Sequence, residues 1–137
     1  MYKTDYLMRV VEEISKMIAT ILALKKEQSK EKALKVIEET LDAYYQLSGK
    51  DLADLSEEQL NILLEEKAPG SLLKAEHLAD LMILLADCWN EPEKEEARKK
   101  LFSKALFILE KVQVLDKQTF NLSRKNKISE IRRRLQD

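Results

Sequence analysis

Glycine and proline occur at only four positions, Gly49, Pro69, Gly70 and Pro92, so few places force a regular element to end. Between them, apolar residues recur at intervals of three and four, the spacing of one face of an α-helix. Leu, Lys, Glu, Ala and Arg make up 75 of the 137 residues, a share typical of long helices. The chain is therefore expected to be all-α, without a phosphate-binding glycine loop, which needs closely spaced glycines.

The apolar periodicity and the expected helix caps divide the chain into six helices. Residues 51–55 are expected to form a turn or one helical turn, and residues 116–121 a connector. We expect five or six helices in a single domain over residues 1–137, arranged as an irregular bundle or a stack of hairpins. The predicted helices run from Thr4 or Asp5 to Lys26, Ser29 or Lys30 to Leu47, Glu57 to Lys67, Leu72 to Trp89, Glu93 to Leu115, and Leu122 to Arg134.

Several helix ends carry recognisable capping residues. Ser56 and Gln59 have the spacing of a capping box, and Ser29 and Ser71 are expected N-caps. Gly49 is expected to end the second helix in a left-handed conformation. The helix over residues 72–89 is apolar almost all round in its second half, which predicts a position at the centre of the fold.

The helices over 72–89 and 93–115 match part of the tetratricopeptide pattern. Arg98 occupies a position where that repeat usually has a small residue, and no second copy is evident, so an ordinary antiparallel helix pair explains the pattern equally well. The matching positions are Met82, Leu85, Ala86, Trp89, Phe102 and Ala105.

The run Asp5-Tyr6-Leu7-Met8-Arg9 resembles the opening of a bacterial family of small helical proteins that has no assigned function. Members of that family begin with Asp-Tyr-(Ile/Leu)-Met-Arg and end in tetratricopeptide-like helices. The resemblance covers the N-terminal helix and, more loosely, residues 97–135. It implies a bacterial cytoplasmic protein and carries over no catalytic or ligand-binding residue.

Charge is distributed unevenly, although the net charge is only −1. Residues 38–66 hold nine acidic residues and one basic residue, and residues 98–134 hold twelve basic and three acidic. The two regions can pair within one chain or between chains. The basic end also allows phosphate binding, which makes a nucleic-acid-binding accessory protein the first alternative function. Its candidate contact residues are Arg124, Lys125, Lys127, Arg132, Arg133 and Arg134.

The residues needed for a metal or catalytic site are sparse. His77 is the only histidine and Cys88 the only cysteine, and the two lie about three helical turns apart. A metal role for His77 lacks further ligands, and Cys88 lacks a neighbouring base. No pair among the 25 carboxylates stands out, so a carboxylate enzyme is only the second alternative. We expect no enzyme activity and no cofactor.

The leading hypothesis is a non-enzymatic protein–protein interaction module or small helical scaffold. Its partner is another protein or a second copy of this chain, and the docking mode is a groove between helices with apolar anchors and a charged rim. Tyr44 and Tyr45 are candidate contact residues, and because they point about 100° apart on one helix, one of them is expected to be exposed. The longest apolar run near the start, Met17 to Leu24, is too short for a membrane span, so a cytoplasmic location is expected.

Overall fold

The computed structural model describes residues 2–116 and 121–136, together with the side chains of residues 5–116 and 121–136. Most of the predicted connector over residues 116–121 lies outside this part. The described chain is all-helical and contains no strand. Its elements are α1 (Tyr2–Lys26), α2 (Lys30–Tyr45), α3 (Gly49–Leu52), α4 (Glu57–Lys67), α5 (Leu72–Cys88), the 3₁₀ helix η1 (Pro92–Lys94), α6 (Glu95–Leu115) and α7 (Leu122–Gln136).

The described residues form seven α-helices rather than five or six, because one expected turn is a short helix. Residues 49–52 close one hydrogen-bonded turn as α3. The other six helices follow the predicted ranges with shifted ends. Helix α1 begins at Tyr2, earlier than predicted, and α6 begins at Glu95 because η1 occupies the residues before it.

The capping predictions are confirmed at two helices, correct in position only at Ser29, and wrong at Gly49. The Ser56 side chain accepts from the amide of Gln59 at 3.1 Å, and Gln59 Oε1 accepts from the amide of Ser56 at 2.8 Å, which completes the capping box. Ser71 caps α5. Ser29 precedes α2, but its side chain makes no capping hydrogen bond.

Gly49 does not end α2 as predicted. The helix stops at Tyr45, and Gln46 takes the left-handed conformation with φ 53°. Gly49 is buried instead, its amide donates to Glu38 Oε1 at 2.8 Å, and a Cβ atom there would collide with the Leu85 side chain. Close approach between segments, rather than backbone conformation, therefore requires glycine at this position.

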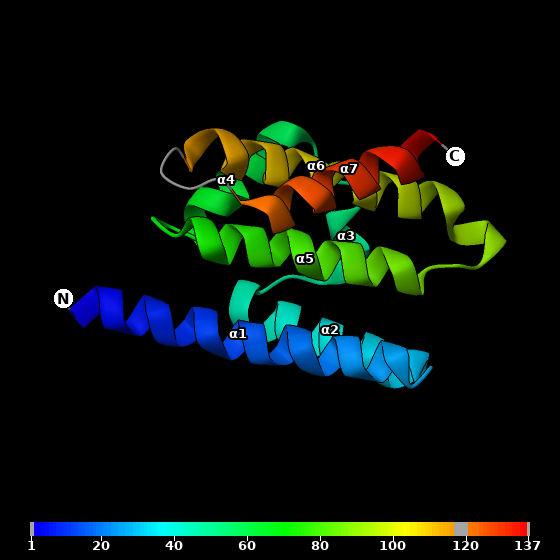
Figure 1. Ribbon diagram of the computed structural model, residues 1–137, viewed down its shortest axis with the longest axis horizontal. Helices are drawn as coiled ribbons and strands as arrows, with labels where there is room; N and C mark the ends of the chain where they lie inside the picture. The colour runs from blue at the N-terminus through cyan, green and yellow to red at the C-terminus, as the bar shows by residue number, and fades with distance from the viewer. Residues whose placement is uncertain (1, 117–120, 137) are drawn as a thin grey trace.

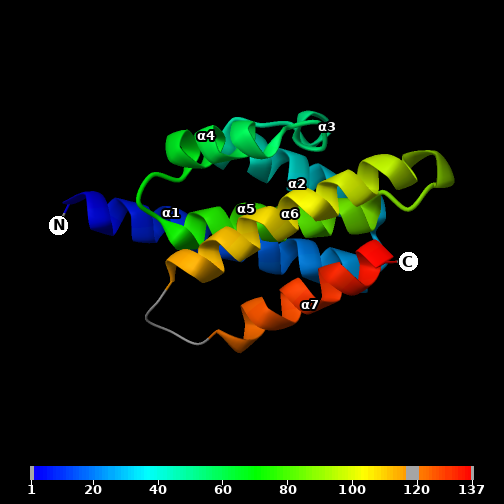
Figure 2. The same ribbon diagram turned by 90° about the horizontal axis from the view of Figure 1, so that it is seen from above.

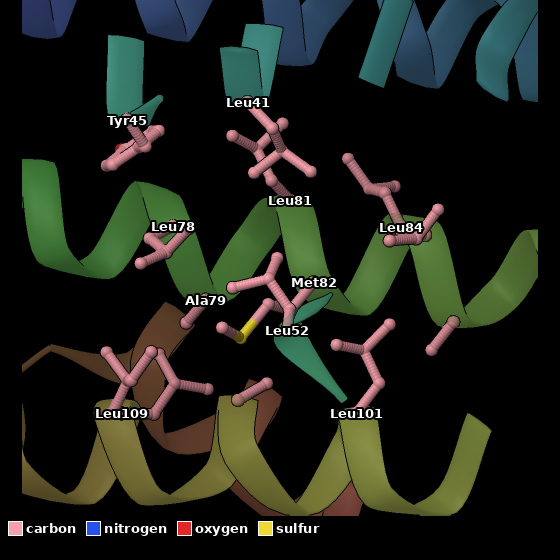
Figure 3. Close-up of a cluster of buried hydrophobic side chains, with 14 of the residues drawn as sticks. Leu41, Tyr45, Leu52, Leu78, Ala79, Leu81, Met82, Leu84, Leu101 and Leu109 are labelled. Carbon is pink, nitrogen blue, oxygen red and sulfur yellow. The ribbon is translucent and has the colours of Figure 1, made fainter. Parts of the chain in front are cut away.

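The helices form a layered bundle with α5 at its centre, as predicted (Figure 1). Helices α1 and α2 pair on one side of α5, and α6, α7 and α4 lie on the other; Figure 2 shows α7 beside α6 and on the opposite side of it from α4. In Figure 3, α5 side chains such as Leu78 and Leu81 meet Leu41 and Tyr45 of α2 on one face, while Ala79 and Met82 face α6. The buried apolar residues form one cluster.

Candidate functional site

The basic C-terminal helix α7 is held against α5 by ion pairs. Arg124 is 2% exposed and donates from Nε and Nη2 to Glu76 Oε1 at 3.0 and 2.8 Å. Asp116 Oδ2 lies 3.2 Å from its Nη1. Burial acts to lower the pKa of Arg124, but Glu76 and Asp116 outweigh that effect and raise the pKa above its ordinary value. Arg124 is therefore a buried, paired charge that no external phosphate reaches.

Two more basic residues of α7 continue this pairing along α5. Lys127 Nζ lies 2.8 Å from Asp80 Oδ1 and 3.2 Å from Glu76 Oε2, and Arg134 pairs with Asp87. Burial acts to lower the pKa of Lys127, yet Asp80 and Glu76 raise it overall. The two helices run in the same direction (Figure 1), so an acidic stripe on α5 meets a basic stripe on α7.

The remaining basic candidates lie on the outer face of α7. Arg132 pairs with Glu110 at 2.6 Å and Arg133 with Glu130 at 2.5 Å, and Lys125 is exposed. Within the described chain, the acidic segment 38–66 makes few ion pairs with the basic segment 98–134. The carboxylates that pair with α7 lie outside 38–66, and Lys100 with Asp54 is the one ion pair found between the two segments among the described residues. These pairs reduce the charge available to a nucleic acid.

The two candidate tyrosines differ in burial, although neither is fully exposed as one of them was predicted to be. Tyr45 is fully buried, and its hydroxyl donates to the carbonyl of Lys74 at 2.6 Å. Tyr44 is half-buried at the surface, where its hydroxyl donates to Glu13 Oε2 at 2.9 Å. Burial and, to a smaller extent, Glu13 raise the pKa of Tyr44. Tyr44 thus lies at the surface of the bundle, and Tyr45 is part of the core.

A Ser-His-Asp series of contacts, which the spacing of these residues along the chain did not indicate, links α1 to α5. Ser15 Oγ and His77 Nε2 share a hydrogen bond of 3.0 Å, and His77 Nδ1 lies 3.5 Å from Asp80 Oδ2. The order matches a catalytic triad. However, Ser15 lies in the middle of α1, where backbone amides bond within the helix and supply no oxyanion hole, and Lys127 already holds Asp80. We interpret these contacts as a link between helices.

Other chemistry-bearing residues are not arranged as a site. Cys88 is buried, and burial raises the pKa of its thiol. Glu76 and Asp80 are two close carboxylates, but both are engaged by Lys127. Within residues 2–116 and 121–136, no group of three or more His, Cys, Asp or Glu side chains is placed to hold a metal ion.

The strongest candidate is an apolar surface at the end of the bundle where α1 and α5 begin and α6 ends (Figure 1). Nine large apolar side chains are exposed in the described chain, and six belong to these segments. We call this surface the end patch. It consists of Tyr6, Met8, Leu72, Leu73, Val114 and Leu115.

Three hollows of about 410, 500 and 580 Å³ surround the turn at residues 69–71 within the end patch. Met8 and Leu73 line the smallest, Tyr6 and Tyr44 the next, and Leu72 and Leu115 the largest. The hollows adjoin, because Gly70 and Ser71 line two of them. Exposed apolar side chains that gather around adjoining hollows are typical of interaction surfaces, whereas singly scattered ones are not.

No described helix is both long enough and apolar enough to cross a membrane. Comparison with known proteins supplies no relative: no family model, no curated protein and no solved structure matches this chain.

Proposed function

We propose that this protein is a non-enzymatic protein–protein interaction module, a small helical scaffold whose end patch docks onto a second copy of the chain. The observation that carries the proposal is the gathering of six of the nine exposed large apolar side chains at one end of the bundle. Burying such side chains is the main driving force of association between proteins. The resemblance of the N-terminal segment suggests a bacterial cytoplasm as the setting.

The charges around the end patch support a second copy as the partner. The three hollows are lined by four basic and four acidic residues, so the surface has no net charge. In a two-fold interface the same surface of each copy faces the other copy. A surface that carries both basic and acidic residues can therefore form ion pairs with a second copy of itself. A strongly acidic or basic partner would leave half of these charges unmatched. The basic residues are Arg9, Lys67, Lys74 and Lys111, and the acidic residues are Glu12, Glu13, Glu65 and Glu66.

The exposed beginning of α1 also supports docking at this end. In both views α1 extends past the first turn of α5 (Figures 1 and 2). Among its described side chains, Ile14 is the first that is buried. A helical segment as short as the beginning of α1 is only marginally stable without a surface to pack against, because most helix stability in proteins comes from tertiary contacts. A second copy crossing α1 would cover Met8 and the neighbouring half-buried Val11.

The α5–α6 pair supports a tetratricopeptide-like hairpin within this scaffold. Ala86 and Ala105 are fully buried, which lets the two helices approach closely, and Phe102 is buried beside them. The nucleic-acid alternative has less support, because Arg124, Lys127 and Arg134 are paired with α5 carboxylates. A carboxylate enzyme has less support because Lys127 pairs with both Glu76 and Asp80.

The test is sedimentation velocity over a concentration series, with Leu73→Lys as the disrupting variant. Leu73 is 57% exposed, so the substitution is compatible with folding. Half of a leucine side chain is worth roughly 1 kcal/mol when buried, and two copies contribute, so the dimer Kd should rise by about 30-fold or more.

Leu22→Lys is the matched control, because Leu22 is 51% exposed on α1 but lies outside the end patch. It should leave the dimer Kd unchanged. A wild-type chain that stays monomeric at millimolar concentration, or equal effects of the two substitutions, would overturn the proposal.

A further inference from the structure

A separate hollow lies between the first turns of α6 and the last turns of α7. These turns are at the opposite end of the bundle from the end patch (Figure 1). The volume of the hollow is about 220 Å³. Four of its six lining residues are basic and one is acidic. We call it the arginine hollow, and its lining residues are Glu95, Arg98, Lys99, Phe102, Arg133 and Arg134.

Arg98 has a buried hydrogen-bond donor that is not satisfied within the described chain. Its Nε atom is buried and donates no hydrogen bond to any group of the described chain, within which no carboxylate pairs with its guanidinium. The guanidinium lies 5.5 Å from the centre of the Phe102 ring, and the guanidinium of Arg134 lies 5.2 Å from the same centre. Each guanidinium is attracted to the face of the ring, but the two like charges repel each other, and an anion bound beside Arg98 would offset that repulsion.

Two other cations of the arginine hollow, Lys99 and Arg134, are only partly compensated. Lys99 lies 3.9 Å from Glu95, and Arg133 and Arg134 share Glu130. Arg134 also contacts Asp87, but Asp87 is shared with Lys25 at 2.9 Å. The hollow therefore keeps an excess of positive charge, with Arg98 as its unmatched donor.

We propose that the arginine hollow binds the phosphate of a phosphate monoester. Guanidinium groups present parallel N–H donors that match the oxygens of phosphate, and charge-assisted bonds of this kind are the strongest hydrogen bonds in proteins. The excess of cations favours a dianion over a singly charged phosphodiester. Arg98 would supply the donor that lacks a partner, and Arg134 and Lys99 would supply opposing charge.

A neighbouring groove indicates the organic part of the ligand. It has a volume of about 600 Å³, lies between α5 and α7, and shares Phe102 and Arg134 with the arginine hollow. Ile83, Leu122 and Ile131 also line it, so much of its wall is apolar. The ligand class is therefore a small phosphate monoester with an apolar or aromatic body.

The test uses phenyl phosphate, inorganic phosphate and phenol as probes, with binding followed by titration of amide chemical shifts and by calorimetry. Phenyl phosphate should bind saturably, inorganic phosphate more weakly, and phenol without detectable affinity. Arg98→Gln should weaken phenyl phosphate binding by about tenfold or more, because a hydrogen bond to a charged group is lost.

Arg132→Gln is the matched control, because Arg132 lies on α7, pairs with Glu110 and does not line the hollow. It should change the affinity by less than about twofold. Without ligand, Arg98→Gln should leave the melting temperature unchanged or raise it, since the substitution removes a charge that faces another charge. Added phenyl phosphate should then raise the melting temperature of the wild type and not that of the Arg98→Gln variant.

Two results would overturn the proposal. One is phenyl phosphate binding that is equal in the wild type and Arg98→Gln, or absent up to about 10 mM. The other is equal binding of single-stranded oligonucleotides with and without a 5′-phosphate, which would indicate recognition of internal phosphodiesters. The Leu73→Lys variant should bind phenyl phosphate normally, so this proposal and the end-patch proposal fail independently.

Discussion

The carboxylate of Glu76 on α5 accepts two hydrogen bonds from the guanidinium of Arg124 on α7, at 3.0 and 2.8 Å, although 48 positions separate the residues. Both side chains are buried. Breaking one side of such a pair leaves an uncompensated buried charge, which costs about 3–5 kcal/mol, whereas replacing both partners costs much less. This pair therefore contributes to the attachment of α7, beside the pairs that Lys127 and Arg134 make with α5.

Arg124→Met is expected to lower the free energy of unfolding by about 3 kcal/mol. The double variant Glu76→Met with Arg124→Met should recover a large part of that loss. Urea denaturation followed by circular dichroism measures both. Arg132→Met, which removes the exposed pair with Glu110, should cost no more than about 0.5 kcal/mol. A cost for Arg124→Met as small as that of Arg132→Met would contradict the account.

Gly49→Ala is expected to destabilise the protein by about 1–3 kcal/mol, because the added methyl group meets the Leu85 side chain and the Glu38 carboxylate. Gly70 differs, since it has φ +68° but nothing within 4 Å of an added Cβ. Gly70→Ala should therefore cost only the backbone strain, about 1 kcal/mol. Thermal unfolding distinguishes the two, and a larger loss at Gly70 than at Gly49 would refute the packing explanation.

Tyr45→Phe is expected to lower stability at neutral pH by about 1 kcal/mol, since it leaves the Lys74 carbonyl without its donor. Burial and, to a smaller extent, Asp80 raise the pKa of Tyr45, so the hydroxyl stays protonated in the folded chain. The unfolded chain ionises near pH 10, so this stabilisation is complete below about pH 10 and is lost as pH rises further.

The difference between wild type and Tyr45→Phe should consequently shrink in denaturation curves recorded above about pH 10. Tyr44→Phe serves as the control, because the Tyr44 hydroxyl donates to an exposed carboxylate and should matter little at any pH. If the stability difference between wild type and Tyr45→Phe stays constant or grows with pH, the explanation that the buried Tyr45 hydroxyl remains protonated is wrong.

Cys88 is expected to react slowly with a disulfide reagent such as dithionitrobenzoate in the native protein and rapidly in denaturant. The thiol is buried, and burial raises its pKa, so little thiolate is present near neutral pH. Absorbance of the released thiolate measures the reaction. Complete and fast modification of the native protein would show that this end of α5 is open to solvent.

The helices were predictable because their signals are local. Apolar spacing defines each buried face, and the Ser56–Gln59 capping box and the Ser71 cap mark two helix starts within four residues. The end of α2 was not predictable in this way. Gln46 supplies the left-handed residue, and Gly49 is needed for its approach to Leu85, a residue 36 positions later in the sequence.

The candidate site was less predictable, because it depends on which charges are already paired. The sequence alone indicates that Arg124 is a solvated or phosphate-binding residue. Only the fold places Glu76 within hydrogen-bond distance of it. One signal was available: acidic residues at 76, 80 and 87 and basic residues at 124, 127 and 134 form two stripes of nearly equal spacing. No sequence pattern indicated the end patch, since its residues come from three helices that meet only in the folded chain.

The most direct test of the end patch is paramagnetic relaxation between two copies of the chain. A nitroxide is attached at Glu12→Cys, which lines one of the hollows, and the labelled protein is mixed with ¹⁵N-labelled wild type. Wild type treated with the same reagent controls for reaction at Cys88, and a label at Leu22→Cys controls for chance encounter.

If two copies meet through the end patch, amide signals of residues 70–73 and 111–115 in the ¹⁵N-labelled copy should broaden with the Glu12→Cys label. They should remain sharp with the Leu22→Cys label. Absence of broadening, or broadening that is the same for both labels, would contradict the claim that this surface is the docking site.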